Sequence, residues 1–264
     1  MPEGDTIHAA AGRLRRSLGG VTIEKVGGSH PAVRRDGRRL QGRTVRAVEA
    51  RGKHLLVRFD HGWTLRTHLG MTGRWDTYGP GERWRASPGK ARVVLEGAGV
   101  VAVCFAAPTV EIAPDAIVDR GLARLGPDLL GDDFDEDRFV TRASAAGPAT
   151  VADLLLDQHL MAGVGNVIKC EVLFAERIHP ATPAAALDDA GVRGLARRAR
   201  KLLQANRDGG PRTTTGLPGD RNRLWVYGRS RLPCRRCRTE IVEGWVGDPP
   251  RITYWCPGCQ PVHP

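Results

Sequence analysis

The sequence lacks an apolar run of the roughly 18–20 residues that a membrane-spanning helix needs. Its longest apolar stretch, residues 98–107, lies between Glu96 and Pro108 and predicts a buried strand. The N-terminal residues Met1 to Asp5 contain neither a basic start nor an apolar core, so they do not resemble a secretory signal. We therefore expect a cytoplasmic protein with no membrane partner.

Lysine is also scarce, since only five of the 40 Lys and Arg residues are lysine and the rest are arginine. With 29 Asp and Glu residues, the formal net charge is +11, which favours a polyanionic partner. Guanidinium groups suit bidentate contacts with phosphates, although codon bias in a high-GC genome also places arginine at ordinary surface positions. A hydrophobic fraction of 41% over 264 residues is sufficient for one large or two ordinary folded domains.

The first half of the sequence has the apolar pattern of a β-rich domain. A helical pattern over residues 7–18 ends at Gly19, and strand-like patterns follow at 55–59, 63–69, 92–96 and 100–105. Turn residues separate these segments. We predict an α+β fold in which residues 1–130 form an N-terminal antiparallel β-sandwich with flanking helices.

After the acidic run 132–137 the apolar pattern takes the period of a helix. Helices are predicted at 151–160, 166–177 and 189–207, the first two joined by a turn that contains glycine. Residues 208–223 are rich in glycine, threonine, arginine and proline, and predict a mobile basic loop. The chain would thus continue with a helical domain at 131–228 and a small module at 229–264.

Four of the six cysteines form two Cys-x-x-Cys pairs separated by 18 residues: Cys234, Cys237, Cys256 and Cys259. This spacing is typical of a tetrahedral Zn²⁺ ion held by four thiolates. Strand-like segments at 240–246 and 251–255 predict a hairpin between the pairs, and disulfides are disfavoured without a secretory signal. We predict one structural zinc ion in a zinc-finger hairpin. Cys104 and Cys170 lie in apolar stretches and are expected to be buried.

Pro2 is a candidate nucleophile, because removal of Met1 would leave it with a free secondary amine. An α-amino group has a reference pKa of about 7.7–8.0, so part of it is neutral at physiological pH. Its attack on C1′ of a sugar gives an iminium ion with no N–H proton to lose, which accepts electrons during elimination at C2′. Glu3 could move protons during opening of the sugar ring. Proline is common at position 2, so this interpretation needs support from the rest of the sequence.

Six motifs provide that support. In chain order they are PEGDT at 2–6, RGKHLL at 51–56, HLGMTG at 68–73, RLGPD at 124–128, LDQ at 156–158 followed by GVGN at 163–166, and WCPGCQ at 255–260. Together they span almost the whole chain and resemble the formamidopyrimidine-DNA glycosylase/endonuclease VIII family of base-excision repair enzymes. The N-terminal motif and LWVYGR at 224–229 are more similar to the endonuclease VIII branch.

The resemblance implies a bifunctional DNA glycosylase and AP lyase whose C-terminal half carries a helix–two-turn–helix. Its partner would be double-stranded DNA with oxidised bases or abasic sites, bound by a monomer in a basic cleft between the domains. Pro2 would be the Schiff-base nucleophile and Glu3 the proton shuttle. Lys53 would assist β-elimination. Arg251 would bind phosphates beside the lesion and assist δ-elimination.

Three further residues acquire DNA-binding roles from the resemblance. Arg124 matches a DNA-binding position, and Asn166 begins a helix whose N-terminus can hold a phosphate, although a plain N-cap is the alternative. Met71 matches an apolar wedge that fills the space left by an extruded nucleotide, with core packing as the alternative. Gly163 and Gly165 would let the backbone approach the DNA strand closely.

The chain also departs from the family pattern. Thr6 stands where many relatives carry a glutamate, so Asp5 is a candidate substitute, and Gly70 cannot supply a polar side chain for DNA. Residues 105–111 lack the Arg/Phe pair that formamidopyrimidine-DNA glycosylases use to hold the orphaned base. This favours oxidised pyrimidines over 8-oxoguanine and formamidopyrimidines, which remain the alternative substrates. A non-catalytic protein that binds damaged DNA is the alternative from another class.

Overall fold

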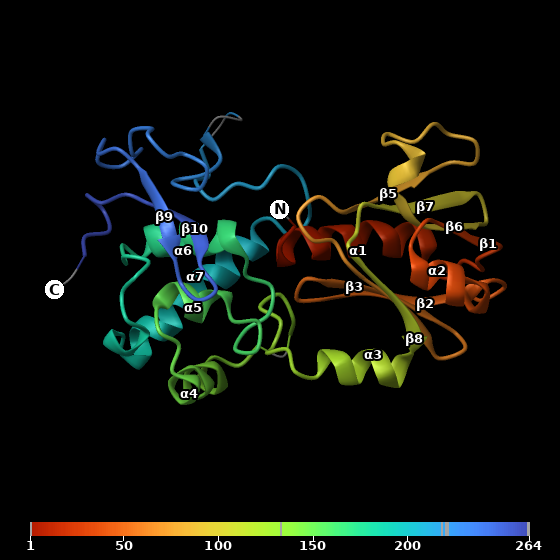
Figure 1. Ribbon diagram of the computed structural model, residues 1–264, viewed down its shortest axis with the longest axis horizontal. Coiled ribbons are helices and arrows are strands. Elements are labelled where there is room, and N and C mark those ends of the chain that lie inside the picture. The colour runs from red at the N-terminus through yellow and green to blue at the C-terminus, as the bar shows by residue number, and fades with distance from the viewer. Residues whose placement is uncertain (1, 133, 218, 220–221, 263–264) are drawn as a thin grey trace. The chain divides into compact units, whose positions relative to one another are not determined.

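The computed structural model describes residues 2–132, 134–217, 219 and 222–262 (Figure 1). The chain divides into two compact units, Met1–Arg124 (unit 1) and Leu125–Pro264 (unit 2). The division falls after Arg124 rather than after residue 130, because Leu129 and Leu130 are buried in the core of unit 2. The helical and hairpin segments both belong to unit 2. No helix in the described part of the chain is long and apolar enough to cross a bilayer.

Unit 1 contains two four-stranded antiparallel sheets, with strand orders β1-β6-β7-β5 and β2-β3-β4-β8. The strands are β1 (Lys25–Gly27), β2 (Val45–Arg51), β3 (His54–Phe59), β4 (Trp63–His68), β5 (Arg74–Tyr78), β6 (Ala91–Gly97), β7 (Val100–Phe105) and β8 (Thr109–Pro114). The turn between β6 and β7 places Ala98 and Gly99 at positive φ, as tight hairpins favour. The predicted strand 100–105 matches β7 residue for residue.

Helix α1 (Gly4–Leu18) supplies one side of the core of unit 1. It packs against β2 and β3 of one sheet and against β5 and β7 of the other, as its place in Figure 1 also shows. Its buried residues, including Ile7, Leu14 and Leu18, recur at helical spacing and lie in one cluster with side chains from both sheets. The predicted sandwich with flanking helices is confirmed. A short helix, α2 (Pro31–Asp36), and the 3₁₀ turns η1 (Gly37–Leu40) and η2 (Pro88–Lys90) also belong to unit 1.

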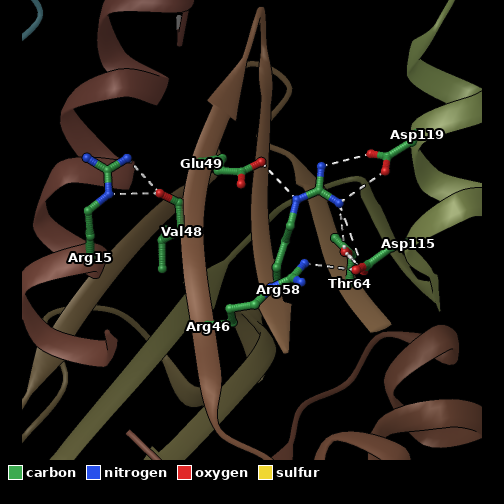
Figure 2. A network of polar contacts seen from close by, with 8 residues as sticks. All are labelled: Arg15, Arg46, Val48, Glu49, Arg58, Thr64, Asp115 and Asp119. Atoms are coloured by element: carbon green, nitrogen blue, oxygen red, sulfur yellow. Dashed lines mark hydrogen bonds and ion pairs between the residues drawn. The ribbon is translucent and has the colours of Figure 1, made fainter. Parts of the chain in front are cut away.

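Helix α3 (Asp115–Leu122) is held on the sheet β2-β3-β4-β8 by a polar network (Figure 2). Arg58 of β3 points away from the core that contains Val57, because successive side chains of a strand alternate between faces. Its guanidinium donates to Glu49 Oε2 at 2.8 Å and to Asp119 Oδ1 on α3 at 2.8 Å. Asp115, the first residue of α3, accepts from Thr64 Oγ1 at 2.5 Å.

Unit 2 contains four α-helices among its described residues, packed around a separate apolar core. They are α4 (Glu136–Ala146), α5 (Val151–Leu156), α6 (Asn166–Ala175) and α7 (Asp189–Gln204), with a 3₁₀ turn η3 (Ala184–Ala186). The acidic run at 132–137 does not end a domain, since Asp135 caps α4 by accepting hydrogen bonds from the N–H groups of Asp137 and Arg138.

Three predicted helices end earlier than expected. The helix predicted over 151–160 stops at Leu156, because Asp157 starts a turn in which its carboxylate accepts from the N–H of His159 at 2.8 Å. Helix α6 stops at Ala175, just before Arg177 adopts a positive φ. Helix α7 stops at Gln204, after which the chain turns. Strands β9 (Val242–Val246) and β10 (Arg251–Trp255) form the predicted hairpin.

Candidate active site and DNA-binding residues

The N-terminal candidates lie at the start of α1 in unit 1. Pro2 is half-buried, whereas Glu3 is fully buried and immediately precedes the helix, where its carbonyl accepts from the N–H of Ile7 at 3.0 Å. Asp5 is buried in the first turn and accepts from the N–H of Thr6 at 2.6 Å. Two buried carboxylates therefore follow Pro2 in the sequence and lie at the N-terminal end of α1, where the helix dipole favours negative charge.

Lys53 belongs to the two-residue turn that joins β2 to β3. Arg51 and His54 pair across this turn, and Gly52 between them has φ of 57°. His54 pairs with His68 on β4, and both imidazoles are close enough to Lys53 for its charge to act on them. Burial, together with the charges of His68, Arg66 and Lys53, lowers the pKa of His54 to about 4. Lys53 thus lies beside imidazoles that stay neutral at physiological pH.

Met71 lies on the turn between β4 and β5 with 75% of its surface exposed. The alternative that it packs in the core is therefore wrong. Gly70 before it has φ of 59°, and a Cβ there would lie 2.7 Å from Pro108. The turn thus requires glycine at this position and presents the methionine outward. Arg124, at the end of unit 1, is exposed.

In unit 2, α5 and α6 are joined by a turn that the side chain of Gln158 organises. Its Nε2 donates to the carbonyls of Leu156 and Val164, and its Oε1 accepts from the N–H of Gly163 at 3.1 Å. Gly163 has φ of 112°, a conformation that favours glycine. This is the predicted two-helix arrangement, with short connecting turns held by one amide side chain.

Asn166 is the first residue of α6, and the N-cap is Gly165. The alternative that Asn166 acts as a plain N-cap is therefore wrong. Its Nδ2 donates to the carbonyl of Ile252 on β10 at 2.7 Å. Its Oδ1 is buried and has no hydrogen-bond partner within the described chain. The side chain thus bridges the helix N-terminus and the hairpin.

Arg251 begins β10 and is exposed. Its side chain makes no hydrogen bond or ion pair with any residue that the structure describes. It lines an open groove of about 540 Å³ in unit 2, together with Gln158, His159 and Asp248. An unpaired guanidinium on a short hairpin is available to an external phosphate.

The four cysteines of the two pairs meet at one point, with their sulfur atoms within 4.8 Å of one another. The Sγ–Sγ distances are 3.4 Å for Cys237–Cys256 and Cys237–Cys259, and 3.9 Å for Cys234–Cys259. Tetrahedral Zn²⁺ with bonds of about 2.3 Å to sulfur requires sulfurs about 3.8 Å apart. The cluster can therefore hold such an ion. Cys104 and Cys170 are buried, as predicted.

The predicted loop 208–223 contains no α-helix or strand among its described residues, and residues 218, 220 and 221 lie outside the description. It is fixed at both ends. Asn206 accepts from the N–H of Thr213 at 2.8 Å, and the N–H of Thr214 donates to the carbonyl of Arg223 at 2.8 Å. Buried Glu171 accepts from the side chain of Thr214 and from the backbone N–H groups of the following segment.

Several residues that organise the site escaped the sequence analysis. Glu171 and Lys169 are fully buried charged residues of α6, and Asp153 of α5 binds the turn of the hairpin. Gln158 belongs to the LDQ motif at 156–158, but the motif did not predict its hydrogen bonds to the turn. Charged residues in the apolar run 166–175 were the available signal, because lysine and glutamate are rarely buried without a partner.

Two family models match this chain. The formamidopyrimidine-DNA glycosylase N-terminal domain matches residues 1–108, and the H2TH domain of the same enzymes matches residues 125–215. The chain belongs to the formamidopyrimidine-DNA glycosylase family. The resemblance carried by the six motifs is confirmed, and membership makes the chain a DNA glycosylase/AP lyase of base-excision repair.

Curated relatives resemble the chain over nearly its full length. It is 42% identical to probable endonuclease 8 2 of Streptomyces coelicolor, covering 98% of this chain and 94% of the relative. It is 39% identical to the DNA-(apurinic or apyrimidinic site) lyase Nei2 of Mycolicibacterium smegmatis, with 98% and 99% covered. The endonuclease VIII-like character inferred from the motifs is thereby confirmed.

A solved structure gives the same fold. A mutant of the Lactococcus lactis formamidopyrimidine-DNA glycosylase, in complex with DNA containing Fapy-dG, superposes with a TM-score of 0.83 at 25% identity. The match covers 99% of this chain and 100% of that one. The L. lactis enzyme with DNA containing an abasic site also gives a TM-score of 0.83 at 25% identity, covering 98% and 100%. Both comparison structures thus contain DNA.

Proposed function

We propose that this enzyme removes oxidised bases from double-stranded DNA through a Schiff base at Pro2 and nicks the strand by β,δ-elimination. The observation that carries the proposal is the start of α1, where Pro2 is followed by the fully buried carboxylate of Glu3. Such a pair supplies the nucleophile and the acid that opening of a sugar ring requires. Met1, whose removal frees the Pro2 amine, lies outside the described residues.

The chemistry proceeds in balanced steps. The lone pair of the Pro2 nitrogen forms a bond to C1′, and the damaged base leaves with the electron pair of the C1′–N bond. The base takes up the proton that the Pro2 nitrogen loses, so the nitrogen regains a lone pair for the opening of the sugar ring. Glu3 protonates O4′ as the C1′–O4′ bond breaks, which yields the iminium ion. Loss of a C2′ proton then feeds electrons toward the iminium and expels the 3′ phosphate, with Lys53 assisting. A second elimination expels the 5′ phosphate, and water releases the sugar fragment from Pro2.

Residues of both units are proposed to bind DNA phosphates. Arg251 offers an exposed guanidinium without a partner in the described chain, and Asn166 lies at the N-terminus of the ten-residue helix α6. Arg124 is a further exposed cation. Met71, exposed on its turn, would fill the space left by the extruded nucleotide.

Oxidised pyrimidines are the proposed preference. Residues 105–111 contain neither arginine nor a second phenylalanine after Phe105, so the expected holder of the orphaned base is missing. Oxidised purines are the competing substrates. Single-turnover excision from duplexes that differ only in thymine glycol, dihydrouracil, 8-oxoguanine or an abasic site would rank them, and faster release of 8-oxoguanine would overturn the preference.

One zinc ion is proposed at Cys234, Cys237, Cys256 and Cys259. The donor set is soft and complete, and the sulfur spacing fits a tetrahedral ion. Four thiolates leave no open position for substrate, so the ion would hold the hairpin together and take no part in the reaction. The protein's own residues on that hairpin, Arg251 above all, would contact DNA.

Borohydride trapping tests the central proposal. The enzyme is made with an N-terminal extension that a protease removes to leave Pro2 as the first residue, and both forms are incubated with abasic DNA and borohydride. We expect a covalent adduct only with the cleaved form, and none with Pro2→Gly in the same format. Equal trapping by the extended form would disprove the Pro2 mechanism. Tight DNA binding without adduct or nicking by the cleaved form would instead support a non-catalytic damage-binding protein.

A further inference from the structure

Lys169 is a fully buried lysine in the middle of α6. Lysine is almost never fully buried without a partner, because removing its ammonium group from water is costly. Its Nζ donates to Thr253 Oγ1 on β10 at 2.6 Å, and Thr253 is fully buried too. The proposed chemistry uses neither residue, so their contact requires another explanation.

Thr253 also forms a hydrogen bond with the backbone of Arg251. Its hydroxyl donates to the carbonyl oxygen of Arg251 at 2.9 Å. A threonine hydroxyl can donate one hydrogen bond while it accepts another, so Lys169 and Arg251 can both be bound at once. Two consecutive hydrogen bonds therefore link the ammonium group in α6 to the backbone of the exposed arginine.

The same face of α6 holds the neighbouring residues of β10. Asn166 binds the carbonyl of Ile252, and the sulfur of Cys170 accepts from the N–H of Tyr254 at 3.5 Å. Positions i, i+3 and i+4 of a helix lie on one side, so Asn166, Lys169 and Cys170 together bind three consecutive residues of the strand. The register of β10 on the helix is thus set by specific polar contacts.

The other side of Arg251 is held by α5. Asp153 Oδ1 accepts from the N–H of Asp248 in the β9–β10 turn at 2.9 Å. Gly247 before it has φ of 89°, and a Cβ there would lie 2.3 Å from Asp153 Oδ1. The backbone is therefore fixed both before and after Arg251, while its guanidinium stays exposed and unpaired within the described chain.

We propose that Lys169 is a positioning residue that acts through Thr253 to fix the backbone of Arg251 for the phosphate that leaves in δ-elimination. This rests on the role proposed above for Arg251. Lys169 itself is buried and does not touch DNA. A displacement of about 1 Å at a reacting group can reduce a rate by up to about 100-fold. Fixing the backbone that carries the exposed Arg251 side chain should therefore affect which elimination product forms.

The test compares Lys169→Met, which keeps a long unbranched side chain, with Thr253→Val, which removes only the hydroxyl. Preformed abasic DNA is incubated under single-turnover conditions, and β- and δ-products are resolved by gel. Both variants should reduce the δ-to-β ratio about tenfold, and the double variant should reduce it no further, because one linkage is broken in each case. Thr253→Ser, which keeps the hydroxyl, should restore the ratio.

A second measurement is independent of activity. Hydrogen exchange of peptides covering 250–255 should be faster in Lys169→Met and Thr253→Val than in the wild type, and close to wild type in Thr253→Ser. Lys201→Met, the same substitution at an exposed position of α7, is the matched control and should change neither measurement. Zinc content and melting temperature establish that each variant is folded.

The possible outcomes distinguish failure of the positioning role of Lys169 from failure of the proposed function. Folded, zinc-containing Lys169→Met and Thr253→Val with the wild-type product ratio and wild-type exchange would overturn the positioning role. A serine variant as impaired as the valine variant would also overturn it, since the hydroxyl would then be irrelevant. Wild-type enzyme that forms no borohydride adduct would refute the proposed function instead, while the exchange data would still decide whether Lys169 fixes β10.

Discussion

The imidazoles of His54 and His68 face each other across adjacent strands, with ring centroids 5.1 Å apart and planes inclined by 56°. Burial is the main cause that lowers the pKa of both rings, and the charges of Lys53 and Arg66 lower it further. Two adjacent imidazolium ions beside a lysine would repel one another. The pair therefore stays uncharged next to Lys53 near neutral pH, and protonation sets a lower pH limit for this part of unit 1.

The free energy of unfolding should fall as the pH drops from about 6.5 to about 4. Below pH 6.5 the unfolded chain binds a proton at His54. In the folded chain the pKa of His54 is about 4, so this residue binds the proton only at a lower pH. After allowance for partial exposure, His54 alone contributes about 1–2 kcal/mol to this loss between pH 7 and 4.5. Urea unfolding of wild type and His54→Gln at both pH values measures it.

If His54→Gln lost as much stability as the wild type between the two pH values, the imidazole pair would not be the source of the effect.

Much of the fold could be read from local patterns. Strands β7 and β10 were predicted at their observed ends, because each is an uninterrupted strand-like run bounded by turn residues. The end of α5 was missed, because Leu160 follows Leu156 at helical spacing while the Asp157 carboxylate already binds the backbone of the next turn. Helix periodicity cannot reveal such a competing side-chain contact.

The site was readable only in part, for a different reason. Pro2, Lys53 and the cysteine pairs lie in short contiguous motifs, so their neighbours in sequence identify them. The partner of His54 is a residue of the next strand, and Thr253 is 84 positions away from Lys169. Contacts of this kind depend on strand register and helix docking, which no local pattern specifies.

Replacing Glu171 by glutamine should destabilise unit 2 by about 2–3 kcal/mol. Both carboxylate oxygens accept backbone N–H groups, from Trp225 on one side and from Val226 and Tyr227 on the other. A glutamine must turn its NH₂ group toward one set of donors, which leaves buried N–H groups unpaired. Chemical unfolding measures the loss, and hydrogen exchange should localise it to residues 213–227.

The matched control is Glu176→Gln, just beyond the same helix. Glu176 pairs with Arg198 near the surface, at 2.6 Å between Oε1 and Nε, and such pairs contribute at most about 1 kcal/mol. Equal destabilisation by the two substitutions would show that burial of Glu171 and its backbone donors are not decisive.

Removal of the metal should loosen the hairpin without melting the helices. The core around the cysteines is small, with Phe174, Val226 and Ile241 among its few buried apolar side chains, whereas α7 packs in a separate cluster. Small modules of this kind depend on their metal for folding energy. Chelation should release one zinc ion per chain and raise hydrogen exchange in residues 229–262, with little change in α7.

Cysteine variants test the assignment of the ligands. Cys234→Ala should lose the zinc, whereas Cys104→Ala, a change at a buried cysteine of unit 1, should retain it. Retention of a full equivalent of zinc by Cys234→Ala, or unchanged exchange in the chelated protein, would contradict the structural role of the ion.

Met71→Ala should separate recognition of a base within the duplex from the chemistry that follows. The side chain is 75% exposed, so its truncation costs the fold little. Extruding a nucleotide costs a few kcal/mol of stacking, part of which an apolar wedge offsets, so base excision from duplex DNA should slow about tenfold. Strand nicking at a preformed abasic site needs no base to be extruded and should change less.

Ile117→Ala, at another exposed apolar residue of unit 1, is the control. Both substitutions remove exposed apolar surface. Equal excision rates in the two variants would therefore mean that the position of Met71 on its turn has no specific effect on base excision.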